Sequence, residues 1–564
     1  MENRQLIECV PNFSEGRDMQ IIKQITDVIE GVEGVKLLDV DPGKATNRTV
    51  VTFVGEPQPV IEAAFLAIKK AGEVIDMRKH KGEHPRMGAT DVCPLVPVAN
   101  ISMEEVVDYA RQLAERAGRE LDIPFFLYEN AATRPERRNL ATVRAGEYEA
   151  LPEKLKKPEW KPDYGPAQFN ARAGATAIGA RDFLIAYNVN LNTTSVRRAN
   201  SVAFDVREQG RVKRKSDSLT GEVEKDAKGN PVRIPGACKA VKGIGWYIEE
   251  YGIAQISMNL TNINVSPLHT VFEECCKSAE SRGLRVTGSE LVGLVPKRVL
   301  IDAGRHFLQK QRRSVGVSEE ELLKIAVRSL GLDELGPFDP RKKVIEYVLE
   351  DAQANPLLKM DLRAFANETA SESMAPGGGS ISAYVGALGA SLATMVANLS
   401  SHRRAWDHRW EEFGEWADRG QRIKDALLGL VDEDTRSFNA IIDAIRLPKA
   451  SAEEKAARHQ AIQDATRYAI EVPFQVIEWS VKAMELARAM TELGNPSSVT
   501  DAGVGALCAR TAAMGAFLNV QVNSADLEDQ AFVGEKLAAG KQLLARADEL
   551  QAEVLEIVHQ KIAK

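Results

Sequence analysis

A polar cluster at residues 80–86 holds residue types that move protons and bind anions. It consists of His80-Lys81-Gly82-Glu83-His84-Pro85-Arg86 and leads into an apolar segment. Histidine exchanges protons near neutral pH, so it often serves as the acid or base of an enzyme. Acidic and basic neighbours can orient an imidazole or hold an anionic substrate. We therefore expect a functional site here. The alternative is a pair of hydrogen-bonded loop histidines.

The same cluster matches the H-x-x-E-H pattern of one group of zinc peptidases. That pattern depends on a helix, which places both histidines on one face. Gly82 would cost about 1 kcal/mol inside a helix, and Pro85 pushes His84 toward an extended conformation. No third ligand follows at a recognisable spacing. We therefore expect no metal, and a zinc-dependent hydrolase is the alternative enzyme.

A second candidate acid, Asp434, lies on the apolar face of a predicted helix. Asp432 and Glu433 are expected to point toward solvent instead. A carboxyl group on a buried face needs either a partner or a chemical task. The partner alternative is a bond to the end of a neighbouring helix. The apolar face consists of Ile423, Leu427, Leu430, Val431, Phe438, Ile441, Ile442 and Ile445.

A glycine-rich turn, Pro376-Gly377-Gly378-Gly379-Ser380, opens an alanine-rich helix. No Gly-Lys-Ser/Thr follows, so the turn is not a phosphate-binding P-loop. Backbone amides at a helix start can still receive a carboxylate. Ser382, Gly386 and Ala390 repeat small side chains, which suits either a dimer interface or a ligand site. We expect Gly494-Asn495 and Asp501, at another helix junction, to line the same pocket.

Two kinds of chain segment position these residues. Up to residue 349 strand and helix patterns alternate, which predicts helices layered on sheets. Beyond it there is almost no strand signal, and long helical patterns follow one another, separated by Pro448, Pro473 and residues 494–498. We predict two α/β sandwich subdomains and an all-α helical-bundle domain. Their limits are 1–182 and 183–349, then a linker at 350–357 and the helical domain at 358–564.

The composition excludes several classes of partner. The chain has 564 residues and a net charge of −7, which argues against nucleic acid as the main partner. Six scattered cysteines without CxxC spacing, and a start without a secretory signal pattern, predict a cytoplasmic protein. Residues 373–401 carry no formal charge, but they are mostly Ala, Gly and Ser. We therefore expect a buried helix and no membrane span.

Several longer motifs follow one another in a fixed order. They are residues 8–16 (ECVPNFSEG), 38–41 (LDVD), 47–50 (NRTV), 80–88 (HKGEHPRMG), 144–152 (RAGEYEALP), 243–247 (GIGWY) and 288–296 (GSELVGLVP). Together they resemble the glutamate formiminotransferase family. Residues 375–380 (APGGGS) are similar to formiminotetrahydrofolate cyclodeaminase. The whole chain thus resembles the bifunctional family in which the two enzymes are fused.

The resemblance implies two coupled reactions of histidine degradation and one-carbon metabolism. The first moves the formimino group of N-formimino-L-glutamate to tetrahydrofolate. The second cyclises 5-formiminotetrahydrofolate to 5,10-methenyltetrahydrofolate and releases ammonia. It further implies tetrahydrofolate as co-substrate, including polyglutamylated forms, no metal, and a homo-oligomer built from dimers. The non-enzyme alternative is a non-catalytic folate-binding scaffold, which a turnover assay would distinguish.

The resemblance also assigns residues. It implies that His84 is catalytic in the first reaction and Asp434 in the second. Both can act as acid-base catalysts, His84 by taking the proton that N5 loses and giving one to the departing glutamate nitrogen. His80, Asp39 and Asp41 are weaker positioning candidates.

The folate-binding segment of the family corresponds to one glycine-bounded stretch. Phe169 can stack there on a pterin; the alternative is a plain surface loop. Residues 170–173 depart from the Val-Pro-Ser-Trp of the animal enzymes. Arg48, Arg86 and Arg181 are candidates for binding substrate carboxylates. The segment consists of Gly165, Pro166, Ala167, Gln168, Phe169, Asn170, Ala171, Arg172, Ala173 and Gly174.

Overall fold

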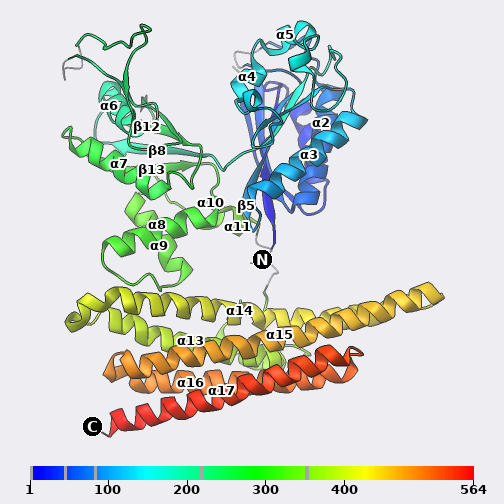
Figure 1. The fold of residues 1–564 in the computed structure, drawn as a ribbon, viewed down its shortest axis with the longest axis vertical. Coiled ribbons are helices and arrows are strands. Elements are labelled where there is room, and N and C mark those ends of the chain that lie inside the picture. Colours follow the sequence, from blue (N-terminus) through cyan, green and yellow to red (C-terminus); the bar gives the residue numbers. More distant parts are fainter. Residues whose placement is uncertain (1–3, 44–46, 82–84, 216–220, 350–354, 564) are drawn as a thin grey trace. The chain divides into compact units, whose positions relative to one another are not determined.

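The computed structural model describes residues 4–43, 47–81, 85–215, 221–349 and 355–563. The chain divides into two compact units, one of residues 1–299 and 330–349 and one of residues 300–329 and 350–564. The first unit carries the sheets and the second is helical in its described part (Figure 1). The predicted change from sheet-containing domains to a largely helical C-terminal region is therefore confirmed.

A seven-stranded mixed sheet forms the first part of unit 1. The strands lie in the order β1-β4-β2-β5-β7-β6, with β3 paired to β4. β7 is parallel to both β5 and β6, and the other pairs are antiparallel. The strands are β1 (Leu6–Cys9), β2 (Asn12–Phe13), β3 (Val35–Gly43), β4 (Arg48–Gly55), β5 (Thr90–Ala99), β6 (Phe125–Glu129) and β7 (Thr176–Ala180).

Three helices cover one face of this sheet, as Figure 1 shows for α2 and α3. Alternation along the strands sends Ile7 and Cys9 into the core beneath the helices. The predicted capping box at Ser102 and Glu105 starts α3, with each side chain bonding the other residue's amide. The helices are α1 (Met19–Glu30), α2 (Pro57–Val74) and α3 (Met103–Glu120). On the other face, α4 (Leu140–Arg144) and α5 (Glu147–Lys154) cover Phe126 and Tyr128.

A four-stranded antiparallel sheet in the order β11-β12-β8-β13 forms the second part of unit 1. Helices α6 and α7 pack on it. A short hairpin, β9 (Arg211–Val212) with β10 (Arg233–Ile234), extends between α6 and β11. The sheet and its helices are β8 (Ile185–Leu191), β11 (Val241–Ile248), β12 (Ile253–Leu260), β13 (Val286–Val292), α6 (Val196–Val206) and α7 (Leu268–Glu280), followed by the short α10 (Pro340–Lys343) and α11 (Ile345–Val348).

Long helices build unit 2, where α13, α14, α15 and α16 pack against one another. The predicted capping box at Ser451 and Glu454 starts α15. The prediction that Pro473 separates two helices is wrong, because α15 continues through it. The helices are α8 (Lys297–Lys310), whose first turn belongs to unit 1, α9 (Glu319–Leu330), α12 (Leu362–Thr369), α13 (Gly378–Ser401), α14 (Trp410–Arg446), α15 (Ala452–Leu493), α16 (Val499–Asn523) and α17 (Gln530–Ile562).

Two of these segments are long and apolar enough to cross a membrane by length and composition. They are Gly378–Ser401 and Pro496–Asp526, with mean hydropathies of 1.5 and 1.2. In the structure 61% and 50% of their apolar windows are buried among the other helices. Core helices of globular proteins meet the same criterion. Length and composition alone therefore do not establish a membrane span.

Candidate functional site

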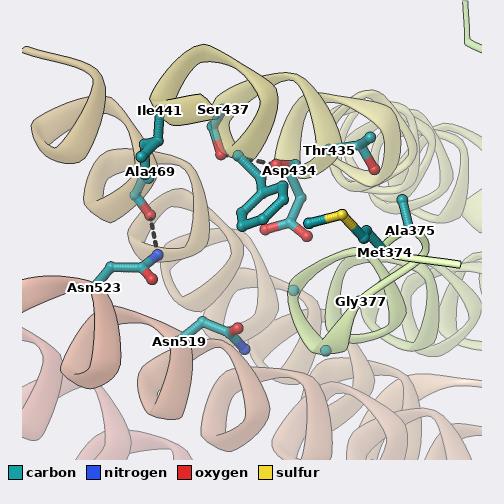
Figure 2. Close-up of a pocket in the computed structure, with 13 residues that line it drawn as sticks. Met374, Ala375, Gly377, Asp434, Thr435, Ser437, Ile441, Ala469, Asn519 and Asn523 are labelled. Atoms are coloured by element: carbon teal, nitrogen blue, oxygen red, sulfur yellow. Dashed lines mark hydrogen bonds between the residues drawn. The ribbon is translucent and has the colours of Figure 1, made fainter. Parts of the chain in front are cut away.

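A cavity of about 130 Å³ lies at the N-terminal end of α13, where α14, α15 and α16 meet it (Figure 2). Polar groups from α14 and α16 and the glycine-rich turn surround it, and Phe438 and Ile441 continue the apolar face of α14 into it. Its lining consists of Met374, Ala375, Gly377, Gly378, Gly379, Asp434, Thr435, Ser437, Phe438, Ile441, Ala469, Asn519 and Asn523.

The carboxylate of Asp434 holds the start of α13. Its Oδ2 accepts hydrogen bonds from the Ser380 backbone amide at 2.8 Å and from Ser380 Oγ at 3.0 Å. The turn approaches so closely that a Cβ added to Gly379 would lie 2.0 Å from Asp434 Oδ1. The glycine at position 379 is thus explained by the carboxylate beside it, not by backbone flexibility.

Burial raises the pKa of Asp434 above its usual value, and the two hydrogen bonds from Ser380 counteract this only in part. A carboxyl group with a raised pKa exchanges protons more readily near neutral pH than an ordinary aspartate does. The partner expected for a buried carboxyl group is therefore present at Asp434. Asp434 bonds a neighbouring helix end through Oδ2, and it also lines a cavity.

Two other predictions for this region are wrong. Asp432 does not face solvent: it is 2% exposed and accepts hydrogen bonds from the amides of Leu357 and Leu358 at 3.0 and 3.2 Å. Gly494 packs beside Val396, near the opposite end of α13 from the cavity. None of Gly494, Asn495 and Asp501 lines that space. Pairing with distant backbone amides explains how Asp432 remains buried.

The small residues of α13 serve packing inside the helical unit. A Cβ on Gly386 would lie 3.1 Å from both Ala512 Cβ and Ser480 Oγ, and one on Gly515 would lie 2.4 Å from Ser382 Oγ. The Ser382, Gly386 and Ala390 positions therefore let α13 approach α15 and α16 closely. They are buried between helices of one chain.

Sequence reasoning missed Asn519 and Asn523, which contribute two amides to the cavity from consecutive turns of α16. Each is four residues from the other on a helix otherwise rich in Ala, Gly and Val. Two amides at that spacing lie on the same helix face. The four-residue spacing of the two asparagines is the sequence feature from which they could have been predicted.

In unit 1, His84 and Glu83 lie outside the described residues, but the residues on either side of them are well held. His80 Nε2 lies 2.8 Å from the Asn47 carbonyl oxygen, and Arg86 Nε donates to His80 Nδ1 at 3.3 Å. Arg86 also pairs with Glu147 and Glu149 at 2.9 and 2.6 Å. Its guanidinium is thus engaged in fixing the chain beside the cluster.

A buried ion pair lies next to this segment. Asp91 accepts from the Met87 amide at 2.9 Å and from Arg144 at 2.7 Å, with 1% of its side chain exposed. Burial lowers the pKa of nearby Arg48, although the Asp91 charge counteracts it. Of the three predicted carboxylate-binding arginines, Arg48 lies in this group. Arg181 lies instead near Glu8 and Tyr128.

The predicted folate-binding segment, residues 165–174, is anchored to the strand that follows the histidine cluster. The Ala89 amide donates to the Ala173 carbonyl at 2.7 Å. Gly174 has a φ of +72°, and a Cβ there would lie 2.2 Å from the Met87 carbonyl oxygen. The segment therefore packs directly against residues that come three to five positions after His84.

Side chains in this segment make local contacts. The Phe169 ring packs against Tyr148 with their centroids 5.4 Å apart, and Tyr148 donates from its hydroxyl to the Ala171 carbonyl. Asn170 Oδ1 accepts from the amides of Arg172 and Ala173. The Arg172 guanidinium donates to carbonyls at the end of α2. These contacts shape the loop and leave Ala167 and Gln168 exposed.

Within the described part of the chain, no group of three or more His, Cys, Asp or Glu side chains is arranged to hold a metal ion.

Two sheet-containing parts followed by helices, with a carboxylate at a glycine-rich helix start, are the architecture expected of a fused transferase and cyclodeaminase. Family models match in the same order: the formiminotransferase domain, N-terminal subdomain, over residues 6–181, the formiminotransferase domain over 186–350, and formiminotransferase-cyclodeaminase over 361–542. The chain belongs to the formimidoyltransferase-cyclodeaminase family.

Relatives cover the whole chain or one part of it. The formimidoyltransferase-cyclodeaminase of Rattus norvegicus is 45% identical over 94% of each chain. Glutamate formimidoyltransferase of Streptococcus pyogenes is 44% identical over 54% of this chain and 94% of its own. Methenyltetrahydrofolate cyclohydrolase of Methylorubrum extorquens is 34% identical over 36% of this chain and 97% of its own. None of these three relatives is named as a zinc hydrolase.

Proposed function

We propose that the protein is an enzyme with two activities that act in sequence. It transfers the formimino group from N-formimino-L-glutamate to tetrahydrofolate, and it cyclises 5-formiminotetrahydrofolate to 5,10-methenyltetrahydrofolate with release of ammonia. The observation that carries the proposal is that one chain is similar, over nearly its full length, to relatives named for both activities.

For the second reaction we propose Asp434 as the acid-base catalyst. N10 of the folate attacks the formimino carbon and forms the new C–N bond, and N10 gives up its proton. The carboxylate can take that proton and return it to the amino nitrogen as the C–N bond to ammonia breaks. The cavity beside Asp434 and its raised pKa support this role.

For the first reaction we propose His84 as the proton carrier. N5 of tetrahydrofolate loses a proton as it attacks the formimino carbon, and the glutamate nitrogen gains one as it leaves. The fixed positions of His80 and Arg86 and the packing of residues 165–174 against Met87 and Gly88 support a folate site beside this segment. In that site Ala167 and Gln168 present exposed groups.

The finer architecture is part of the same proposal. Helices packed on each sheet favour two α/β sandwiches, and the mutual packing of α13 to α16 favours a bundle. We keep the domain limits 1–182, 183–349 and 358–564, with residues 300–329 packing on the helical unit. The proposed steps use protein side chains for every proton transfer, so they need no metal.

We also propose that the helical unit forms dimers. An apolar surface follows α13 and α16, where Gly389 and Gly505 bring the two helices together. Exposed contiguous apolar surface of this kind marks protein interaction sites. We call it the α13–α16 face. Its exposed residues are Leu388, Met395 and Leu399 on α13 and Val504, Leu507, Met514, Leu518 and Val522 on α16.

The two activities can be tested together. The protein is incubated with formiminoglutamate and tetrahydrofolate, while methenyl-folate absorbance and ammonia are followed. We expect both products from the wild type, neither from His84→Ala, and accumulated 5-formiminotetrahydrofolate from Asp434→Asn. The side-chain amide introduced by Asp434→Asn retains an oxygen that can accept from Ser380, so the helix start is kept. If the wild type showed no turnover, the proposal would be contradicted, and the non-catalytic folate-binding scaffold would remain as the alternative.

A further inference from the structure

Pro473 interrupts the backbone hydrogen bonding inside α15. Proline has no backbone N–H, so the carbonyl four residues earlier loses its helical partner. That carbonyl belongs to Ala469, and Asn523 Nδ2 of α16 donates to it at 2.7 Å. Both Ala469 and Asn523 line the cavity beside Asp434. The proline therefore provides an acceptor that holds a polar side chain in the cavity wall.

The amide orientations of Asn519 and Asn523 follow from their partners. Asn519 Nδ2 donates to the Gly515 carbonyl at 2.9 Å, and Asn523 Nδ2 donates to that of Ala469. Carbonyl oxygens only accept hydrogen bonds, so the nitrogen of each amide must face them. The oxygens are directed away from these carbonyls. Figure 2 shows both amides and the Asp434 carboxylate around the same space.

The cavity wall therefore includes three side chains with acceptor oxygens, beside the backbone of the α13 start. Asp434 and the two amides contribute oxygens, Phe438 and Ile441 contribute apolar surface, and none of the described residues that line the cavity is basic. Such a lining suits a flat ligand with several N–H groups along one edge. The 2-amino group and the N3–H of a reduced pterin form an edge of this kind.

We infer that Asn519 and Asn523 determine specificity for the pterin of the cyclisation substrate, by accepting hydrogen bonds from its 2-amino and N3–H edge. Pro473 is a positioning residue that keeps the Ala469 carbonyl open for Asn523. This inference rests on the proposed cyclodeaminase function and adds the recognition of the substrate, which Asp434 does not supply.

The first test replaces each asparagine by leucine, which has a similar shape but cannot hydrogen bond. With 5-formiminotetrahydrofolate supplied directly, we expect KM for cyclisation to rise about tenfold for each variant, with kcat within about threefold of the wild type. Gln521→Leu, at an exposed position of the same helix, is the matched control. An unchanged KM in Asn519→Leu and Asn523→Leu would overturn the inference.

A 2-desamino analogue of the substrate separates recognition from folding. The wild type should lose about tenfold in kcat/KM with this analogue, since one hydrogen-bond donor is missing. In the asparagine variants kcat/KM should be nearly the same for the analogue and the normal substrate, because they no longer accept hydrogen bonds from that edge. Equal discrimination by wild type and variants would contradict the assignment. A wild type that does not cyclise the normal substrate would instead refute the proposed function.

Pro473→Ala tests the positioning role. Alanine restores an N–H that competes for the Ala469 carbonyl, so the Asn523 amide loses its fixed partner. We expect a higher KM without a lower melting temperature, since alanine favours a helix interior over proline. In the Asn523→Leu background the same change should have no further effect on KM. Additive effects of the two changes would show that Pro473 acts independently of Asn523.

Discussion

Gly379 lines the cavity and lies directly against the Asp434 carboxylate. Any side chain at this position would meet the Asp434 carboxylate, since an added Cβ lies 2.0 Å from Oδ1 and 2.5 Å from Cγ. The carboxylate or the first turn of α13 would have to shift. The effect on the second reaction should therefore be that of a misplaced catalytic group.

We predict that Gly379→Ala lowers the cyclisation rate about 100-fold, the cost typical of a displacement near 1 Å. The transferase activity should stay unchanged. Gly429→Ala, at an exposed position of α14, is the matched control, because a Cβ there has no atom within 4 Å and Gly429 does not line the cavity. Both rates are measured with each variant. Equal cyclisation rates in the two variants would contradict the crowding at Gly379.

The buried environment of Glu8 makes the stability of the protein depend on pH. Glu8 is 6% exposed, and burial raises its pKa to about 7 although the nearby Arg181 charge opposes the shift. The unfolded chain loses this proton near pH 4.5. Between these values the folded form holds a proton that the unfolded form has lost, so stability falls as pH rises through this window.

We predict that Glu8→Gln removes this decline, which amounts to at most about 1.4 kcal/mol per pH unit. Denaturation midpoints of wild type and variant are compared at pH 5 and pH 7.5. The gap between the two proteins should widen in favour of the variant at the higher pH. Glu105→Gln, at an exposed capping position, controls for general charge effects. Parallel profiles would exclude Glu8 as the titrating group.

At the scale of elements, the sequence predicted what depends on neighbouring residues. The starts of α3 and α15 follow from Ser102 with Glu105 and from Ser451 with Glu454, each pair three residues apart. Such boxes need no knowledge of the rest of the chain. The strand and helix periods likewise report which face is buried, and this was sufficient to place the change from sheets to helices.

Contacts between elements explain what could not be predicted. The burial of Asp432 depends on amides 75 and 74 residues away. Pro473 is accommodated inside α15 where Asn523 donates a hydrogen bond to the Ala469 carbonyl. Serine is a frequent helix cap, yet Ser266 does not cap α7: Pro267 is the capping residue, and Ser266 donates to the Lys239 carbonyl. Local sequence patterns indicate which roles a residue can take. Contacts with distant parts of the chain determine which role it has in the structure.

At the scale of the whole molecule, the α13–α16 face makes the oligomeric state testable. We predict that the wild type sediments as a dimer or a multiple of dimers. Leu518→Asp with Val522→Asp should shift it toward the monomer, because buried charges without partners oppose association. Ile562→Asp, at an exposed site on α17, is the control. Unchanged sedimentation of the double variant would remove this face as the interface.

Residues 300–329 belong to the helical unit although the segments on either side belong to unit 1, and this affects how the two activities can be separated. This segment is embedded in the helical unit: the Gly316 carbonyl accepts from Asn398 and Gln421, and Arg305 pairs with Asp418 at 2.6 Å. The chain therefore passes between the units at 299/300, 329/330 and 349/350. A protease nick near residue 350 severs just one of three tethers. A fragment of residues 350–564 would lack residues 300–329, which pack within the helical unit. Separating the two units genetically therefore requires more than one chain break.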